Sequence, residues 1–125
     1  MKESEFCKLF TDTASLLKCK VVDIPDTKMI NANNRHFNKE KRRPFDFILV
    51  TPTEKFFIEA KVAYRKQKDH QVATENWLGS DYYVIRRRET KKRGAIYSVE
   101  QKQIQIYETQ DISGLVKYFI SGGNR

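Results

Sequence analysis

Two short runs of aromatic and β-branched residues constrain the fold of this chain more than any other feature. They cover residues 45–50 and 56–62 and are separated by Thr51-Pro52-Thr53-Glu54-Lys55. Such runs favour strands, and a connection of about five residues between them favours an antiparallel hairpin. If the hairpin is symmetric, its centre lies near Thr53 and residues whose numbers sum to about 105 face each other. The sequence therefore predicts a two-stranded hairpin with a defined register.

Three charged residues share one face of this hairpin. The register places Asp46 opposite Glu59, and the two-residue period of a strand puts Lys61 on the same face. Opposed like charges destabilise a strand pair, whereas a divalent cation with oxygen ligands from both carboxylates removes the repulsion. A neighbouring lysine can orient a water molecule or offset charge that develops on a phosphate. The alternative is a salt bridge between Lys61 and one of the acids on an exposed sheet face.

The residues around these charges resemble a nuclease signature. Pro44-Phe45-Asp46 with Glu59-Ala60-Lys61 is similar to the motif of the PD-(D/E)xK nuclease superfamily, where an Asp begins one strand and an acid-x-Lys ends the next. Within the superfamily the chain looks most like the Holliday-junction resolvases of the archaeal Hjc and bacterial RecU types. The resemblance extends over residues 3–87, and the residues that match clearly are Asp46, Glu59, Lys61 and Gln71.

The resemblance implies both a fold and an activity. The fold is α/β (α+β) and restriction-endonuclease-like, with a mixed central sheet flanked by helices. The activity is Mg²⁺-dependent cleavage of branched DNA by a homodimer, with Mn²⁺ as a possible substitute. Asp46 and Glu59 would bind the metal together with the carbonyl group of Ala60. Lys61 would position the attacking water, and Gln71 would reach the lysine or the scissile phosphate; the alternative for Gln71 is a surface position without a role.

An acid of the first helix is a further candidate metal ligand. Residues 3–18 carry apolar side chains at helical spacing, and the resembled family often adds an acid from this helix to the metal site. Glu3 lies nearer the apolar face than Glu5, so Glu3 is the better candidate. Acids in a first helical turn are also ordinary partners of the helix dipole.

The charge balance favours a polyanionic partner. The chain has 24 Lys plus Arg against 16 Asp plus Glu, a formal net charge of +8 at pH 7. Such an excess suits the phosphate backbone of DNA, although the surface of a soluble protein can be equally basic. The alternative for residues 86–93 is a solvated, mobile hairpin tip, which can still order on contact with DNA. The expected DNA-binding residues are Lys41, Arg42, Arg43, Arg65, Arg86, Arg87 and Arg88.

The remaining pattern predicts one domain over residues 1–125 with a mixed sheet. Residues 26–41 are polar, rich in Asn and without periodicity, which predicts a flexible loop. Ser113 is a possible N-cap of the last helix. The expected helices cover residues 3–18, 66–78 and 113–120, and the expected strands outside the hairpin cover residues 21–24, 81–87, 95–99 and 103–107.

Cysteine usage and hydropathy favour a cytoplasmic protein. Cys7 and Cys19 would stand about 18 Å apart on a continuous helix, which is too far for a disulfide bond, so both are expected as reduced thiols. No window approaches the roughly eighteen apolar residues of a membrane span, and the N-terminus has no long apolar stretch, so neither secretion nor membrane insertion is expected.

Aromatic and histidine residues add weaker hypotheses. Trp77 is expected to pack in the core, whereas Tyr64 follows the second strand of the hairpin and is a candidate for contact with DNA. His70 is a possible general base, but a single histidine is more often a surface or capping residue. His36 beside Asn31, Asn33 and Asn34 could suggest a ββα-metal nuclease, yet that fold needs a closer set of ligands.

Three other functions remain compatible with the same residues. The chain can be a nuclease of the same fold with another DNA target, a DNA-binding module without activity, or an interaction protein in which the acidic pair is structural. Cleavage of a four-way junction compared with linear duplex and flaps separates the first from a resolvase. Dependence on Mg²⁺ separates the second, and the effect of Lys61→Ala on stability alone identifies the third.

Overall fold

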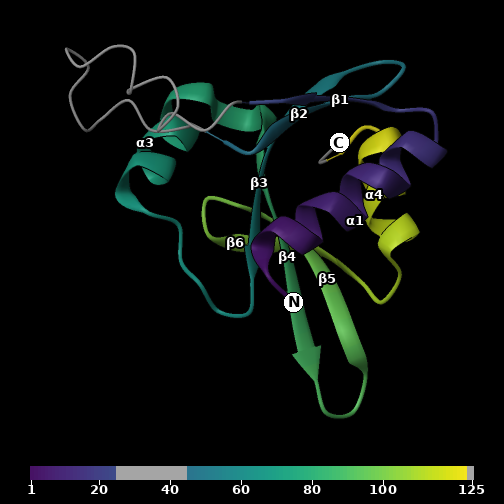
Figure 1. The fold of residues 1–125 in the computed structure, drawn as a ribbon. Coiled ribbons are helices and arrows are strands. Elements are labelled where there is room, and N and C mark those ends of the chain that lie inside the picture. The colour runs from purple at the N-terminus through teal and green to yellow at the C-terminus, as the bar shows by residue number, and fades with distance from the viewer. Residues whose placement is uncertain (25–44, 124–125) are drawn as a thin grey trace, which may run out of the picture.

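A six-stranded mixed sheet forms the centre of the protein. We describe residues 1–24 and 45–123 of a computed structural model. Within these ranges, three α-helices and one 3₁₀-helix accompany the sheet (Figure 1). The strands are arranged in the order β1 (Lys20–Asp23), β2 (Phe47–Val50), β3 (Lys55–Val62), β4 (Tyr82–Thr90), β5 (Gly94–Gln101) and β6 (Ile104–Thr109). The helices are α1 (Glu3–Leu16), α3 (Asp69–Leu78), η1 (Gly79–Asp81) and α4 (Ile112–Ile120).

The β2–β3 hairpin has the predicted register. Phe47 lies opposite Ile58 and Val50 opposite Lys55, so paired residue numbers sum to 105. The two strands are antiparallel, whereas β3 and β4 are parallel and are connected through α3. The remaining neighbours in the sheet are antiparallel. The expectation of a mixed central sheet flanked by helices is therefore confirmed.

Helices α1 and α4 cover one face of the sheet and build the main core. They lie side by side in Figure 1, and Phe10 of α1 has its ring centroid 6.0 Å from Phe119 of α4 and 5.6 Å from Phe47 of β2. Alternate residues of β3, namely Phe56, Ile58 and Ala60, face the same core. Full burial of one such large apolar side chain contributes about 1.5–3 kcal/mol.

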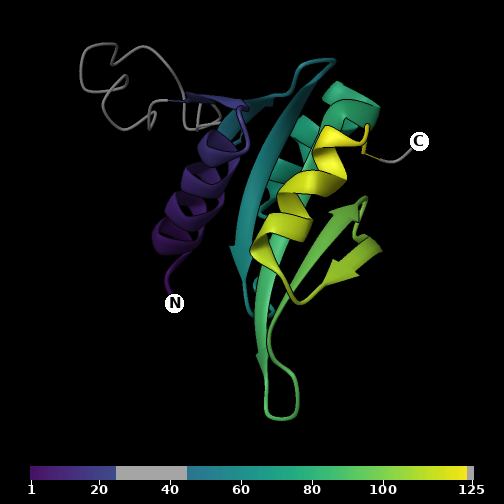
Figure 2. The ribbon, with the colours of Figure 1, turned by 90° about the vertical axis from the view of Figure 1, so that its right-hand side faces the viewer.

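Helix α3 covers part of the opposite face, which is more polar. A smaller cluster of Phe45, Tyr82 and Val84 is buried there, and Leu78 of α3 packs against it. The two-residue period of β3 turns Glu59 and Lys61 towards this face. Figure 2 shows α1 and α4 from the side, with the β4–β5 turn extending below them.

Several boundaries differ from the sequence-based expectation. Helix α3 begins at Asp69 rather than residue 66, and β4 and β5 extend further towards their common turn. Ser113 is not the cap of α4; Oδ1 of Asp111 accepts a hydrogen bond from the Ser113 N–H over 3.2 Å. Trp77 is 84% exposed, so the expected core position is wrong. The buried positions of α3 are instead the polar Gln71 and Glu75.

Three other expectations concern segments or chemistry away from the core. The predicted loop over residues 26–41, with His36 and the neighbouring Asn residues, lies outside the described residues. Cys7 and Cys19 are free thiols, and burial raises the pKa of Cys19. Among the helices in the described ranges, none is long and apolar enough to cross a membrane.

Candidate functional site

Asp46 lies one residue before β2, where regular pairing with β3 stops. Its backbone N–H donates a hydrogen bond to the carbonyl oxygen of Ile58 over 2.9 Å. Its side chain reaches two residues further along β3, where Oδ2 accepts the backbone N–H of Ala60 over 2.8 Å. A carboxylate oxygen thus bonds a backbone N–H of β3 at the end of the hairpin. This bond fixes the Asp46 carboxylate beside the Glu59-Ala60-Lys61 segment.

Glu59 and Lys61 are buried together under α3. Their side chains are 5% and 4% exposed, and the Lys61 Nζ lies 4.0 Å from Oε1 of Glu59. The same Oε1 accepts a hydrogen bond from Nε2 of Gln71 over 2.8 Å. A buried carboxylate is strongly destabilising unless it is paired and hydrogen-bonded, and Glu59 has both kinds of partner. Three of the residues expected at the site therefore lie in contact.

Gln71 is oriented by the start of α3. Its Oε1 accepts the backbone N–H of Lys68 over 2.8 Å, so its amide group both caps the helix and donates to Glu59. The sequence places Gln71 in the site with Lys61 or a phosphate as its expected partner, whereas its side chain donates to Glu59 in the structure. Gln71 is 7% exposed, so the alternative of a surface glutamine is wrong.

Glu75 and Tyr82 extend the polar interior, and the sequence reasoning missed both. Glu75 is 2% exposed; its Oε1 accepts from Nε2 of Gln67 over 3.2 Å and its Oε2 accepts the backbone N–H of Lys102 over 2.8 Å. Burial raises the pKa of Tyr82 well above its usual range, and Glu59, Glu75 and Asp46 contribute to the shift. The four-residue spacing of Gln71 and Glu75, which puts them on one helix face, could have identified Glu75.

A cavity of about 300 Å³ opens beside Asp46 on the side of α1. Asp23 of β1 and Cys7 of α1 are among the residues that line it. In residues 1–24 and 45–123, no group of three or more His, Cys, Asp and Glu side chains is arranged to hold a metal ion. Mg²⁺ can bind through one or two carboxylates and retain several waters. Asp46 and Glu59, with the carbonyl group of Ala60, which follows Glu59 in the sequence, supply that donor chemistry.

Glu3 has a different partner. Its Oε1 lies 3.7 Å from Nη1 of Arg65, in the connection between β3 and α3. Glu3 therefore places the first turn of α1 near the end of β3, and its carboxylate faces the guanidinium group of Arg65. Glu5 accepts the backbone N–H of Lys2 over 3.1 Å as part of the helix cap.

The expected DNA-binding arginines divide into tethered and exposed side chains. Nε of Arg86 lies 2.6 Å from Oε2 of Glu100, and Nη1 donates to the carbonyl oxygens of Ala63 and Arg65 over 2.9 and 2.7 Å. Arg86 thus fastens the β3–α3 connection to the sheet. The Arg65 side chain is 72% exposed.

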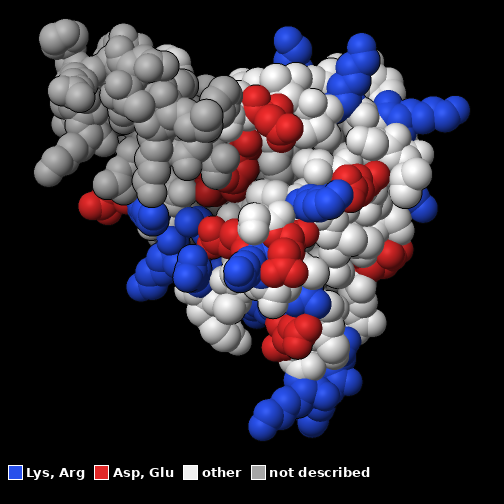
Figure 3. Space-filling view, viewed as in Figure 1, with Lys and Arg blue, Asp and Glu red and all other residues white. Residues whose placement is uncertain are grey.

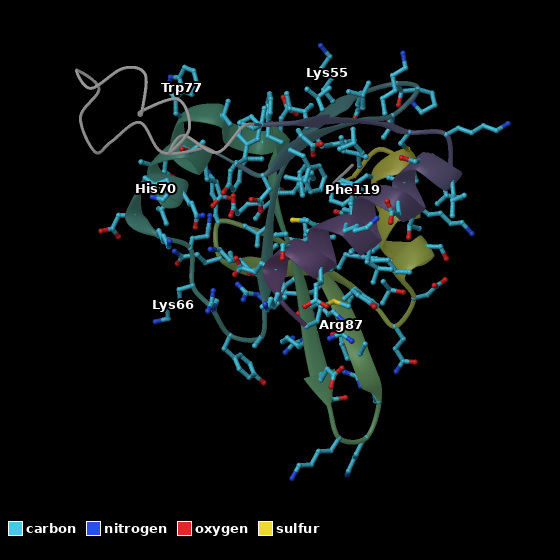
Figure 4. The ribbon with its side chains drawn as sticks, in the orientation of Figure 1. Lys55, Lys66, His70, Trp77, Arg87 and Phe119 are labelled. Carbon is cyan, nitrogen blue, oxygen red and sulfur yellow. The ribbon has the colours of Figure 1, made fainter. Side chains whose placement is uncertain are left out.

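Among the described residues of the prediction, Arg87 and Arg88 lie on β4, and Tyr64 follows the end of β3. Nη2 of Arg87 contacts Glu89 over 2.9 Å, and Nη2 of Arg88 donates to Gln105 over 3.4 Å. Tyr64 is 82% exposed. Lys41, Arg42 and Arg43 lie outside the described residues. In Figure 3, basic side chains gather below a central acidic region, and Figure 4 places Lys66 and Arg87 in this part of the molecule.

His70 is adjacent to Gln71 on the first turn of α3 and is half-buried. Successive helical residues are about 100° apart, so His70 points away from the direction in which Gln71 reaches Glu59.

Neither the family models nor the curated proteins contain a match to this chain.

Proposed function

We propose that this protein is a metal-dependent DNA endonuclease with a restriction-endonuclease-like fold. The observation that carries the proposal is the bond between Oδ2 of Asp46 and the N–H of Ala60. It joins the Asp of the first strand to the centre of the Glu-x-Lys segment of the second. The bond holds the Asp46 carboxylate beside the segment that carries Glu59 and Lys61.

The electrostatics of the site also support a cation as ligand. At 4.0 Å, the attraction between Glu59 and Lys61 is about 4 kcal/mol at an effective dielectric constant of about 20. Removal of two charges from water costs several kcal/mol for each. The attraction within the pair therefore does not offset the cost of burying both charges. Asp46 adds a second negative charge nearby. A divalent cation between the two carboxylates would balance the site.

The residues can divide the hydrolysis of a phosphodiester among them. Asp46 and Glu59 would hold Mg²⁺ or Mn²⁺, which would polarise the phosphate and stabilise charge on the leaving oxygen. Lys61 would orient the attacking water and offset charge on the phosphate. Gln71 would keep Glu59 in one orientation, as outer-shell hydrogen bonds commonly do for metal ligands.

Branched DNA and a homodimeric assembly are the most specific parts of the proposal. Both follow from the resemblance to junction resolvases, because two symmetric cuts require two sites. A DNA-binding module without activity is the second candidate. It is favoured by the exposed basic side chains of the connection between β3 and α3, such as Arg65, whose side chain is 72% exposed and could bind phosphates without a metal ion.

Cleavage of a labelled four-way junction with and without Mg²⁺ tests the proposal. Asp46→Asn is the sharpest variant, because the amide oxygen can still accept the Ala60 N–H while the charge is lost. Lys61→Met removes the second charge with similar side-chain length. We expect both variants to bind the junction and to lose cleavage by at least about 100-fold. Linear duplex and flap substrates identify the preferred DNA structure.

Asp12→Asn is the matched control, because the Asp12 side chain is 61% exposed and forms an ion pair with Lys8 at the surface of α1. It should cut at the wild-type rate. Wild-type cleavage by Asp46→Asn would falsify the nuclease mechanism, and binding without any cleavage by the wild-type protein would identify the DNA-binding module.

A further inference from the structure

The β4–β5 hairpin extends beyond the rest of the sheet as a two-stranded ribbon. Arg87 lies opposite Val62, the last residue of β3, and β4 continues to Thr90. On the other side, pairing of β5 with β6 begins only at Tyr97. Three strand residues beyond the neighbouring strand correspond to about 10 Å. In both Figure 1 and Figure 2 the ribbon projects away from the helices.

The turn of this ribbon is well defined and basic. Thr90 is paired with Gly94, and Oγ1 of Thr90 accepts the Arg93 N–H over 3.0 Å. Gly94 has φ +69°, a conformation that strains residues with a side chain. Lys91 and Lys92 are exposed at the tip and have no ion pair among the residues that the structure describes. Two strongly hydrated charges are thus held at a fixed distance from the sheet.

A second basic segment lies at the same end of the molecule. The connection from β3 to α3 carries Arg65, Lys66 and Lys68, all exposed. Arg86 of the ribbon binds the carbonyl oxygens of this connection, so the two segments are fixed relative to each other. In the β3–β4 register, Lys61 of the proposed site lies opposite Arg86, between the two basic segments. Figure 3 shows the corresponding basic groups on the lower left and at the bottom of the molecule.

We propose that the β4–β5 ribbon enters a groove of the DNA substrate, with Lys91 and Lys92 on its phosphates. This inference rests on the proposal that the substrate is DNA. Arg86 is level with Lys61, and Lys91 is five residues further along the chain, about 16 Å away at strand spacing. A duplex bound at Lys61 would therefore have phosphates within reach of the tip. The major groove, about 12 Å wide, admits a two-stranded ribbon.

The composition of the tip favours nucleic acid over an acidic membrane. Membrane surfaces bind segments that bury apolar side chains in addition to charge. Residues 90–94 are Thr-Lys-Lys-Arg-Gly and contain no large apolar side chain. Duplex DNA attracts such a segment through phosphates alone.

Equilibrium binding in the absence of divalent metal tests the ribbon. The double variant Lys91→Gln/Lys92→Gln removes both charges, and Lys20→Gln/Lys55→Gln removes two exposed charges at the opposite end of the molecule, where Figure 4 labels Lys55. Fluorescence anisotropy with labelled linear duplex and junction DNA, measured over a range of NaCl concentrations, gives the affinity and its salt slope. We expect the slope of the ribbon variant to fall by about 1.8, since each phosphate contact contributes about 0.9.

The control pair should leave the slope unchanged. Equal slopes for the ribbon and control variants would overturn the proposal. So would a loss of binding to phosphatidylserine vesicles while duplex binding stays unchanged. Because the salt slope needs no cleavage, the ribbon and the nuclease mechanism can fail separately: Asp46→Asn should abolish cleavage and leave the slope intact.

Discussion

Nε2 of Gln71 donates a hydrogen bond to Oε1 of Glu59 over 2.8 Å, and the same oxygen lies 4.0 Å from Nζ of Lys61. This oxygen of Glu59 therefore connects Gln71 of α3 to Lys61 of β3. The contact links the stability of the α3 face to the orientation of a proposed metal ligand.

Gln71→Ala should weaken both stability and metal binding. The substitution removes the donor to Glu59 and the acceptor of the Lys68 N–H, and an unsatisfied buried polar group costs about 1–3 kcal/mol. Urea unfolding measures the loss of stability. Titration with Mn²⁺ should show a roughly 10-fold to 100-fold lower affinity, as expected for lost outer-shell contacts. Gln110→Ala, at an exposed position, is the control and should change neither quantity.

Arg86→Ala should destabilise the fold by about 2 kcal/mol. It leaves Glu100 without its bidentate partner and frees the carbonyl oxygens of Ala63 and Arg65. Breaking a fully buried pair costs about 3–5 kcal/mol, and partial exposure of this pair reduces the loss. Chemical denaturation provides the measurement. Arg65→Ala should have an effect below about 0.5 kcal/mol, because that side chain is largely in solvent; comparable losses in the two variants would contradict the tethering role of Arg86.

Alkaline pH should destabilise the protein through its buried tyrosines. Burial, with Tyr83 and Tyr107, raises the pKa of Tyr118 to about 12, and burial with nearby carboxylates raises the pKa of Tyr82 further. The folded state then holds these protons more tightly than the unfolded chain, whose tyrosines have a pKa of about 10. The contribution of these tyrosines to the free energy of unfolding should be constant below about pH 10 and should decrease as the pH rises towards 12.

Tyr82→Phe identifies the contribution of that phenol. The variant should show a shallower decrease in unfolding free energy above about pH 10 than the wild type. Tyr64→Phe alters an exposed phenol and should follow the wild-type curve. Urea unfolding at a series of pH values measures the pH dependence of the free energy of unfolding for each variant. The same pH dependence in Tyr82→Phe and the wild type would show that Tyr82 does not cause the alkaline destabilisation.

Trp77 should report on the surface of α3 and not on the core. It is the single tryptophan of the chain and is 84% exposed. Its fluorescence should be readily quenched by iodide in the folded state, and Trp77→Ala should change the free energy of unfolding by less than about 0.5 kcal/mol. Protection from iodide in the free protein would show that another surface covers the indole ring.

The hairpin could be predicted because its determinants are local. A loop of fixed length between two apolar runs sets the register, and the register brings Asp46 next to the Glu59-Ala60-Lys61 segment. The role of Arg86 could not be predicted in this way. Its partner Glu100 is on a strand whose pairing is unknown from sequence, so a tethered arginine and a DNA-binding arginine look the same.

Helix α3 shows a different limit of sequence reasoning. The expectation for Trp77 rested on its position at the end of the helix beside Leu78. The buried positions are Gln71 and Glu75, because the sheet face below already contains Glu59 and Lys61. A helix usually buries its apolar side chains, whereas α3 buries polar ones. This arrangement can be recognised only when the helix and the sheet face beneath it are considered together.

The unequal covering of the two sheet faces has a consequence for sequence change. The size and shape of the apolar side chains beneath α1 and α4 determine whether the chain folds. The groups of the proposed site project from the opposite face of the same strands. Because adjacent positions of β3 belong to opposite layers, a substitution at Ile58 or Ala60 should alter folding yield, and one at the neighbouring Glu59 should alter chemistry. Substitutions in β3 should therefore have separate effects at alternate positions. A change on one face of the strand should leave the side chains of the other face in place.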